Sequence, residues 1–240
     1  MTPFQLRPAA TPLDFQGPLM TGFSTARQKM VDGQVRPSDV TDFRIIDAML
    51  AVPREAFVPS HQRAMAYLDL DLDVSEAGTA SRFLIKPVVT AKMMQAAEIG
   101  EADHVLVVGC ASGYAAAVIA KLGCRVTATE SDPALAAHAS DTLAELGLGN
   151  VTVRTSAAAE GDASGAPFDV IVLNGATEIV PERLYVQLRE GGRLVGVFAM
   201  TQPPRATIVT RSHGEFGNRA LFDAVVPVLP GLERLPAFVF

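Results

Sequence analysis

The hydrophobic pattern in the second half of the chain alternates short apolar runs with amphipathic segments. The runs are rich in β-branched residues, as buried parallel strands are, and cover residues 104–109, 125–130, 150–155, 168–173 and 193–199. Helical spacing marks residues 113–122, 133–146 and 181–189. Strands that alternate with helices predict an α/β fold with a doubly wound, mostly parallel sheet and right-handed crossovers.

Two further apolar runs lie near the C-terminal end of the sequence. Residues 206–211 and 220–228 flank His213-Gly214, a pair suited to a tight turn. This pattern predicts an antiparallel hairpin at one edge of the sheet.

The first hundred residues predict helices that precede the sheet. Residues 1–22 lack periodicity and predict a loose leader, with Met20 as an alternative start. Helical spacing begins at Ser24 and breaks at Arg36-Pro37. A second helix follows, capped by Ser38 or Thr41, with an apolar face made of Phe43, Ile45, Ile46, Met49 and Leu50.

Residues 64–84 alternate acidic with aliphatic side chains, which predicts a half-buried strand or an extended loop. The acids of residues 69–73 lack the Gly and Glu of a calcium-binding loop, so they are interpreted as a solvated face. A third helix runs from Pro87 to Ile99. We therefore predict one compact domain: a leader (1–22), a helical segment packed on the core (23–100) and the α/β core (101–240).

One turn carries the strongest chemical signal in the chain. The apolar run of residues 104–108 ends in a small-residue turn made of Gly109, Cys110, Ala111, Ser112 and Gly113, which opens the next helix. Such a turn brings backbone close to a ligand and aims a helix N-terminus at it. One strand later Glu130 stands where nucleotide-binding α/β folds hold a ribose. The turn and the acid together predict a nucleoside cofactor site, although Ala111 replaces the middle glycine of a dinucleotide fingerprint.

The composition and charge of the chain argue against several classes of function. The chain has 240 residues, 49% of them hydrophobic and 19% charged, with a net charge of −6. The sequence has no cluster of basic residues that would predict nucleic-acid binding. It also has no apolar run long enough to predict a membrane span. The two cysteines, Cys110 and Cys124, are interpreted as buried small residues, and the four histidines lack ligand spacing, so no metal is expected. These features favour a cytoplasmic protein.

The sequence resembles the protein-L-isoaspartate O-methyltransferase family from about Met30 to Val228. The motifs that carry the resemblance are Val52-Pro53-Arg54-Glu55-Ala56-Phe57-Val58-Pro59, the turn at residues 105–114 with Glu130, residues 166–172, and Gly191-Gly192-Arg193-Leu194-Val195. The resemblance implies a Rossmann-like methyltransferase that binds S-adenosylmethionine. Its partners would be isoaspartyl-containing proteins or peptides, whose carboxyl it esterifies.

The resemblance also implies roles for individual residues. Ser81 would orient the substrate carboxylate and Asn174 would face the methyl group, with residues 23–100 on the substrate side. The cofactor would contact the turn, Glu130, Asn174 and, after the third strand, Ser156 and Ala157. A carboxylate is already a nucleophile, so the reaction needs alignment more than a strong base.

Three positions depart from the family pattern. Aligned on Pro87, Ile85 stands in place of the serine of the T-I-S-x-P segment. Val107 replaces the acid that serves the methionine ammonium, and Ser156-Ala157-Ala158 replaces the G-D-G that holds adenine.

These departures leave alternatives open. The chain is either a working isoaspartyl methyltransferase or a divergent paralogue that lost the activity and acts as a binding or regulatory module. A methyltransferase with a changed substrate is a third possibility. The edge hairpin and the apolar residues 235–240 offer a homodimer contact, and these residues can also pack on their own domain.

Overall fold

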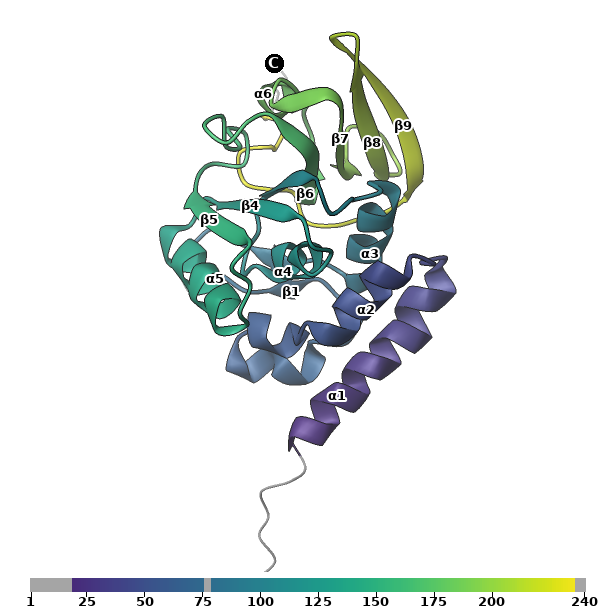
Figure 1. The fold of residues 1–240 in the computed structure, drawn as a ribbon, viewed down its shortest axis with the longest axis vertical. Coiled ribbons are helices and arrows are strands. Elements are labelled where there is room, and N and C mark those ends of the chain that lie inside the picture. The colour runs from purple at the N-terminus through teal and green to yellow at the C-terminus, as the bar shows by residue number, and fades with distance from the viewer. Residues whose placement is uncertain (1–18, 76–78, 236–240) are drawn as a thin grey trace, which may run out of the picture.

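A seven-stranded sheet forms the centre of the molecule (Figure 1). The computed structural model describes residues 19–75 and 79–235. The strands are β3 (His104–Val108), β4 (Arg125–Glu130), β5 (Val151–Thr155), β6 (Phe168–Thr177), β7 (Leu188–Phe198), β8 (Arg205–Ser212) and β9 (Glu215–Asp223). Their spatial order is β5-β4-β3-β6-β7-β8-β9.

Strands β3 to β7 pair in parallel, and β8 pairs antiparallel with both β7 and β9. The predicted doubly wound sheet with an antiparallel hairpin at its edge is therefore confirmed. Strand order reverses between β3 and β6, and the crevice outside the carboxyl ends of strands at such a point is where open α/β sheets bind ligands.

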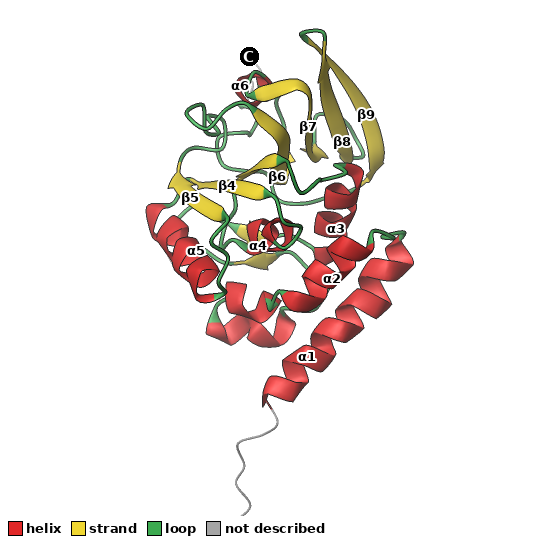
Figure 2. Cartoon of the chain, viewed as in Figure 1, coloured by secondary structure: helices red, strands yellow, loops and turns green. Residues whose placement is uncertain are grey.

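Helices cover one face of the sheet more fully than the other. In Figure 2 the first five helices lie below or beside the strands, whereas the short α6 lies near the top of the view. The helices are α1 (Leu19–Met30), α2 (Phe43–Ala51), α3 (Pro87–Ala96), α4 (Tyr114–Ala120), α5 (Pro133–Glu145) and α6 (Glu182–Tyr185). None of the helices within the described ranges is long and apolar enough to cross a membrane.

Alternate side chains along the strands pack into two separate apolar clusters, one on each face of the sheet. Val105 and Val107 of β3 join a large cluster that also contains residues of α2, α3, α4 and α5. Leu106 and Val108 point to a smaller cluster, which α6 and the segment after β9 complete. The period of two along β3 is that of a strand buried on both faces. The larger cluster thus joins the N-terminal helices to the sheet.

Several element ends differ from the sequence prediction. α1 begins at Leu19, inside the range assigned to a leader, and residues 1–18 lie outside the described chain. The cap of α2 is Asp42, which accepts from the Arg44 amide, and not Ser38 or Thr41. Phe43 was expected on the apolar face, but it stands at the first position of α2 and is 71% exposed.

The acids of residues 69–73 are solvated as expected at Asp69 and Asp73, which are exposed, whereas Asp71 is half-buried. The Asp71 carboxylate accepts from the Lys86 amide at 2.9 Å and lies 3.8 Å from the Lys86 ammonium. The Asp69 carboxylate accepts from the Val88 amide at 3.3 Å. Both acids therefore satisfy free amides at the start of α3, where negative charge is stabilising. Burial raises the pKa of Asp71.

A short hairpin follows these acids and leads into α3. β1 (Leu72–Asp73) pairs antiparallel with β2 (Phe83–Leu84), so residues 64–84 are mostly loop and turn. Beyond β9 the chain crosses the carboxyl end of β6, where Val228 bridges Ala176 in parallel. Of the apolar residues 235–240, offered above as a dimer contact, Leu235 is 86% exposed and residues 236–240 lie outside the described chain.

Candidate cofactor site at the carboxyl ends of β3, β4 and β6

The turn after β3 has the backbone shape of a ligand-binding loop. Gly109, Ala111 and Gly113 have positive φ angles of 67°, 52° and 100°. Ala111 thus adopts the left-handed conformation without being glycine, which costs about 1–2 kcal/mol. The Cys110 amide donates to Thr129 O at 2.8 Å, and Asn174 Nδ2 donates to Gly109 O at 2.9 Å. The turn is therefore fixed to both neighbouring strands.

Two of the predicted cofactor residues in this turn point into the protein. Ser112 is buried, and its Oγ donates to Phe57 O at 2.5 Å, which joins the turn to the N-terminal segment. Cys110 is fully buried, and this burial raises the pKa of its thiol. Neither residue therefore exposes its side chain to a ligand.

The Glu130 carboxylate at the end of β4 is fully buried and accepts from six donors. Oε1 accepts from Arg82 Nε at 2.7 Å, the Ser131 amide at 2.7 Å, Ser131 Oγ at 3.2 Å and the Asp132 amide at 3.2 Å. Oε2 accepts from Arg82 Nη2 at 2.7 Å and the Ala111 amide at 2.8 Å. A carboxylate offers about four lone-pair sites, so Glu130 has no acceptor capacity left.

Arg82 is the partner that sequence reasoning missed. Its side chain is 3% exposed and forms a two-pronged ion pair with Glu130, the strongest geometry for these groups. Its backbone is held in the short hairpin, because its amide donates to Ser75 Oγ and its carbonyl accepts from the Val74 amide, both at 2.8 Å.

A leucine from the C-terminal segment occupies the crevice between β3 and β6. The Leu229 amide donates to Ala176 O at 2.9 Å, which places the side chain over two glycines. A Cβ added to Gly109 would lie 2.5 Å from Leu229 Cδ2, and one added to Gly175 would lie 2.8 Å from Leu229 Cγ. Glycine at both positions is what allows Leu229 to lie there, 4% exposed.

The space left at this point is small. The cavity has a volume of about 10 Å³ and is lined by Ser81, Arg82, Phe83, Ile85, Gly109, Ala111, Asn174, Pro227, Val228 and Leu229. This is roughly the volume that one water needs. The structure thus brings together Ser81, Asn174 and the turn, as the sequence analysis expected, around a nearly filled cavity.

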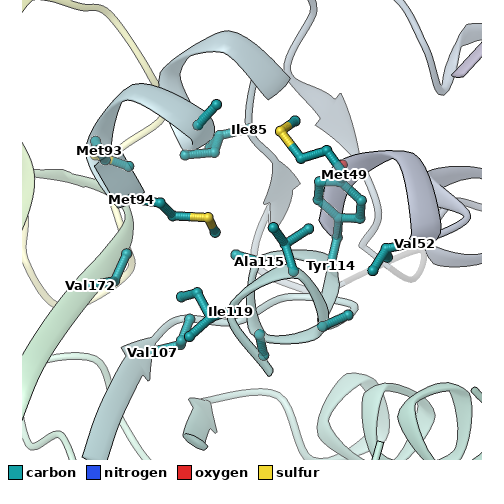
Figure 3. Packing of buried hydrophobic residues seen from close by; sticks show 14 of the residues in the cluster. Met49, Val52, Ile85, Met93, Met94, Val107, Tyr114, Ala115, Ile119 and Val172 are labelled. Carbon is teal, nitrogen blue, oxygen red and sulfur yellow. The ribbon is translucent and has the colours of Figure 1, made fainter. Parts of the chain in front are cut away.

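The remaining predicted residues lie elsewhere. Ser156 follows β5, beside Glu130, and its amide donates to Glu130 O at 2.9 Å. Ala157 is exposed, and neither residue lines the cavity. Val107 and Ile85 are both buried in the larger apolar cluster, part of which Figure 3 shows. The family's acid position is therefore part of the hydrophobic core in this chain.

Sheet order, glycine turn and strand-end acid define the class of Rossmann-like nucleotide-binding α/β proteins. The family model described as protein-L-isoaspartate(D-aspartate) O-methyltransferase matches residues 25–220. The chain belongs to this family.

Relatives support the same assignment over most of the sequence. A protein-L-isoaspartate O-methyltransferase of Koribacter versatilis is 36% identical over 221 residues, which cover 92% of this chain and 98% of that protein. One of Gloeobacter violaceus is 41% identical over 80% of this chain and 93% of its own length.

Solved structures share the fold. A protein-L-isoaspartate O-methyltransferase superposes with a TM-score of 0.77 at 24% identity, covering 86% of this chain and 67% of its own. A Plasmodium falciparum homologue in complex with S-adenosyl-L-homocysteine gives a TM-score of 0.70 at 17% identity, covering 86% and 97%. At these identities the likeness is one of fold.

As the side chains lie, the site does not fit the family's cofactor. Pockets that bind small molecules and cofactors enclose about 300–1,000 Å³, whereas the cavity at the turn has a volume of about 10 Å³. Arg82 fills the acceptor sites of Glu130, and Leu229 lies directly on Gly109. The apolar Val107 offers nothing to an ammonium group, which is costly to bury unpaired.

Proposed function

We propose that this chain is an S-adenosylmethionine-dependent methyltransferase that esterifies the carboxyl group of isoaspartyl residues in damaged proteins. The observation that carries the proposal is the family match over residues 25–220, because it spans the N-terminal helical segment as well as the α/β core. The sheet, the turn after β3 and the acid at the end of β4 support it. The comparisons do not favour the alternative, a paralogue without the activity.

We also propose that Ser81 orients the substrate carboxylate and that Asn174 faces the methyl group. Both line the small cavity at the turn, one from the segment before β2 and the other from β6. Residues 23–100 would then form the substrate side of the site. Within this segment Arg54 donates to Ile85 O at 2.8 Å and so fixes the chain beside Ser81. Homodimer formation and a cytoplasmic location stay predictions.

Methyl transfer to an isoaspartyl peptide is the direct test. The full chain, given S-adenosylmethionine with a radiolabelled methyl group, is expected to label an isoaspartyl peptide and to leave the peptide with normal aspartate unlabelled. The aspartyl peptide is the matched control, because it differs only in which carboxyl continues the backbone. No label in the isoaspartyl peptide at saturating cofactor, with the protein folded, would contradict the proposal.

Ser81→Ala is expected to lower kcat/KM for the isoaspartyl peptide by about tenfold or more, because one hydrogen bond to a charged group contributes roughly 1.5–3 kcal/mol. Ser140→Ala is a suitable control, since Ser140 is exposed on α5, away from the cavity. Equal rates for Ser81→Ala and wild type would remove Ser81 from the site.

A further inference from the structure

The ion pair between Arg82 and Glu130 has a geometry that a ribose would also use. Nε and Nη2 of the guanidinium donate side by side to the two carboxylate oxygens, each at 2.7 Å. The two neighbouring hydroxyls of a ribose present the same kind of double donor, and strand-end acids of nucleotide-binding folds accept from them. Arg82 therefore imitates the ribose diol on Glu130.

We infer that Arg82 sets the cofactor affinity of this site: its guanidinium occupies the ribose position on Glu130 and must leave before the cofactor binds. The inference rests on the proposed function, which supplies the cofactor. It adds a residue that the family pattern does not predict, since the resemblance assigns Glu130 to the cofactor and gives Arg82 no role.

Because the Glu130 carboxylate has no free acceptor site, it cannot bind the Arg82 guanidinium and a ribose at the same time. Glu130 is fully buried and already accepts from the Ala111, Ser131 and Asp132 amides. With Arg82 in place no lone pair remains for a hydroxyl donor. A ribose can bind there only in exchange for the guanidinium, because simultaneous binding would leave donors unpaired in a buried site.

The exchange takes place at the side chain of Arg82. Its backbone is fixed to Ser75 and Val74 in the hairpin, whereas its guanidinium sits at the end of several rotatable bonds. The binding-competent state has the guanidinium withdrawn and the Leu229 side chain moved off Gly109. The apparent dissociation constant then exceeds the intrinsic one by the reciprocal of the fraction of molecules in that state.

Isothermal titration of S-adenosylhomocysteine into the full chain and its Arg82→Ala variant tests the inference. Arg82→Ala is expected to bind at least about tenfold more tightly than wild type, which corresponds to about 1.4 kcal/mol. The double variant Arg82→Ala, Glu130→Gln is expected to lose this gain. Arg205→Ala is the matched control, because it removes an arginine from an exposed ion pair with Asp223, and its affinity should equal that of wild type.

Equal or weaker binding by folded Arg82→Ala would overturn the inference, and so would the absence of binding in every Arg82 variant. Removal of Arg82 also removes the partner of a buried carboxylate, so folding is checked by circular dichroism. If Arg82→Ala does not fold, Arg82→Lys carries the test. A lysine keeps the charge but not the two-pronged geometry, and it should bind more tightly than wild type; no gain would again overturn the inference.

The two proposals fail in different ways. Tighter binding by Arg82→Ala without methylation of the isoaspartyl peptide would leave the role of Arg82 standing and refute the substrate. Methylation by wild type with no gain in affinity on removal of Arg82 would leave the function standing and refute the exchange.

Discussion

Glu130→Ala is expected to lower the free energy of unfolding by about 3–5 kcal/mol, since removal of one partner leaves the other as an uncompensated buried charge. The Arg82 side chain is 3% exposed, and Glu130 is its ion-pair partner among the described residues. The Ala111, Ser131 and Asp132 amides would lose their acceptor as well. Urea unfolding followed by circular dichroism measures the change.

Glu130→Gln is expected to lower the free energy of unfolding only slightly less than Glu130→Ala does. Its amide nitrogen, placed at either carboxylate position, faces donors only: Arg82 and the Ala111 amide on one side, Arg82 and the Ser131 amide on the other. Asp223→Ala is the control, because it breaks an exposed ion pair with Arg205 and should change stability by less than about 1 kcal/mol. A Glu130→Ala protein as stable as the Asp223→Ala control would refute this account of the buried pair.

The sequence predicts the convergence of the turn, Glu130 and Asn174 for a simple topological reason. Each follows or ends an apolar run, and the carboxyl ends of parallel strands meet at one edge of a sheet. The local sequence pattern is therefore enough to place the turn, Glu130 and Asn174 at the same edge of the sheet. The hydrogen bond between Asn174 and Gly109, 65 residues apart, also requires that β6 lie beside β3, an order that local pattern does not specify.

Arg82 and Leu229 could not be predicted in this way. Arg82 contacts a residue 48 positions away, and the alternation of residues 64–84 has ended before it, so no local pattern marks its position. Leu229 follows Pro227 in a segment outside the strands and helices, and its place depends on the pairing with Ala176. Two glycines, Gly109 and Gly175, are the remaining signal, because close approach of a side chain to backbone requires glycine.

The predicted end of the helix at residues 181–189 is also wrong, because residues that follow it pair with a neighbouring strand. Gly191-Gly192 follows the predicted helix, and glycine commonly ends a helix, so the sequence places a turn there before the last parallel strand. In the structure α6 ends at Tyr185, and β7 already begins at Leu188. An irregularity in the pairing with β6 absorbs the glycines, and the Gly192 position is so close to Phe168 O that a Cβ would lie 3.0 Å from it.

Arg54→Ala is expected to lower the free energy of unfolding by about 3 kcal/mol or more. Arg54 is fully buried, and burial lowers the pKa of its guanidinium. Nε donates to Ala66 O and Nη2 to Ile85 O, both at 2.8 Å, and the guanidinium lies 4.6 Å from the centre of the Tyr114 ring. Alanine leaves two buried carbonyls unpaired, at about 1–3 kcal/mol each, and a cavity beside the ring.

Two further variants separate hydrogen bonding from packing. Arg54→Met keeps most of the side-chain volume and loses the donors, so it should recover the packing part of the loss and no more. Arg63→Ala is the control, since Arg63 is exposed nearby and should change stability by at most about 0.5 kcal/mol. Wild-type stability in Arg54→Met would show that the carbonyl bonds contribute nothing. A loss in Arg54→Met accompanied by a higher KM for the isoaspartyl peptide would follow from the contact with Ile85, because that bond fixes the chain that carries Ser81 and Arg82 into the site.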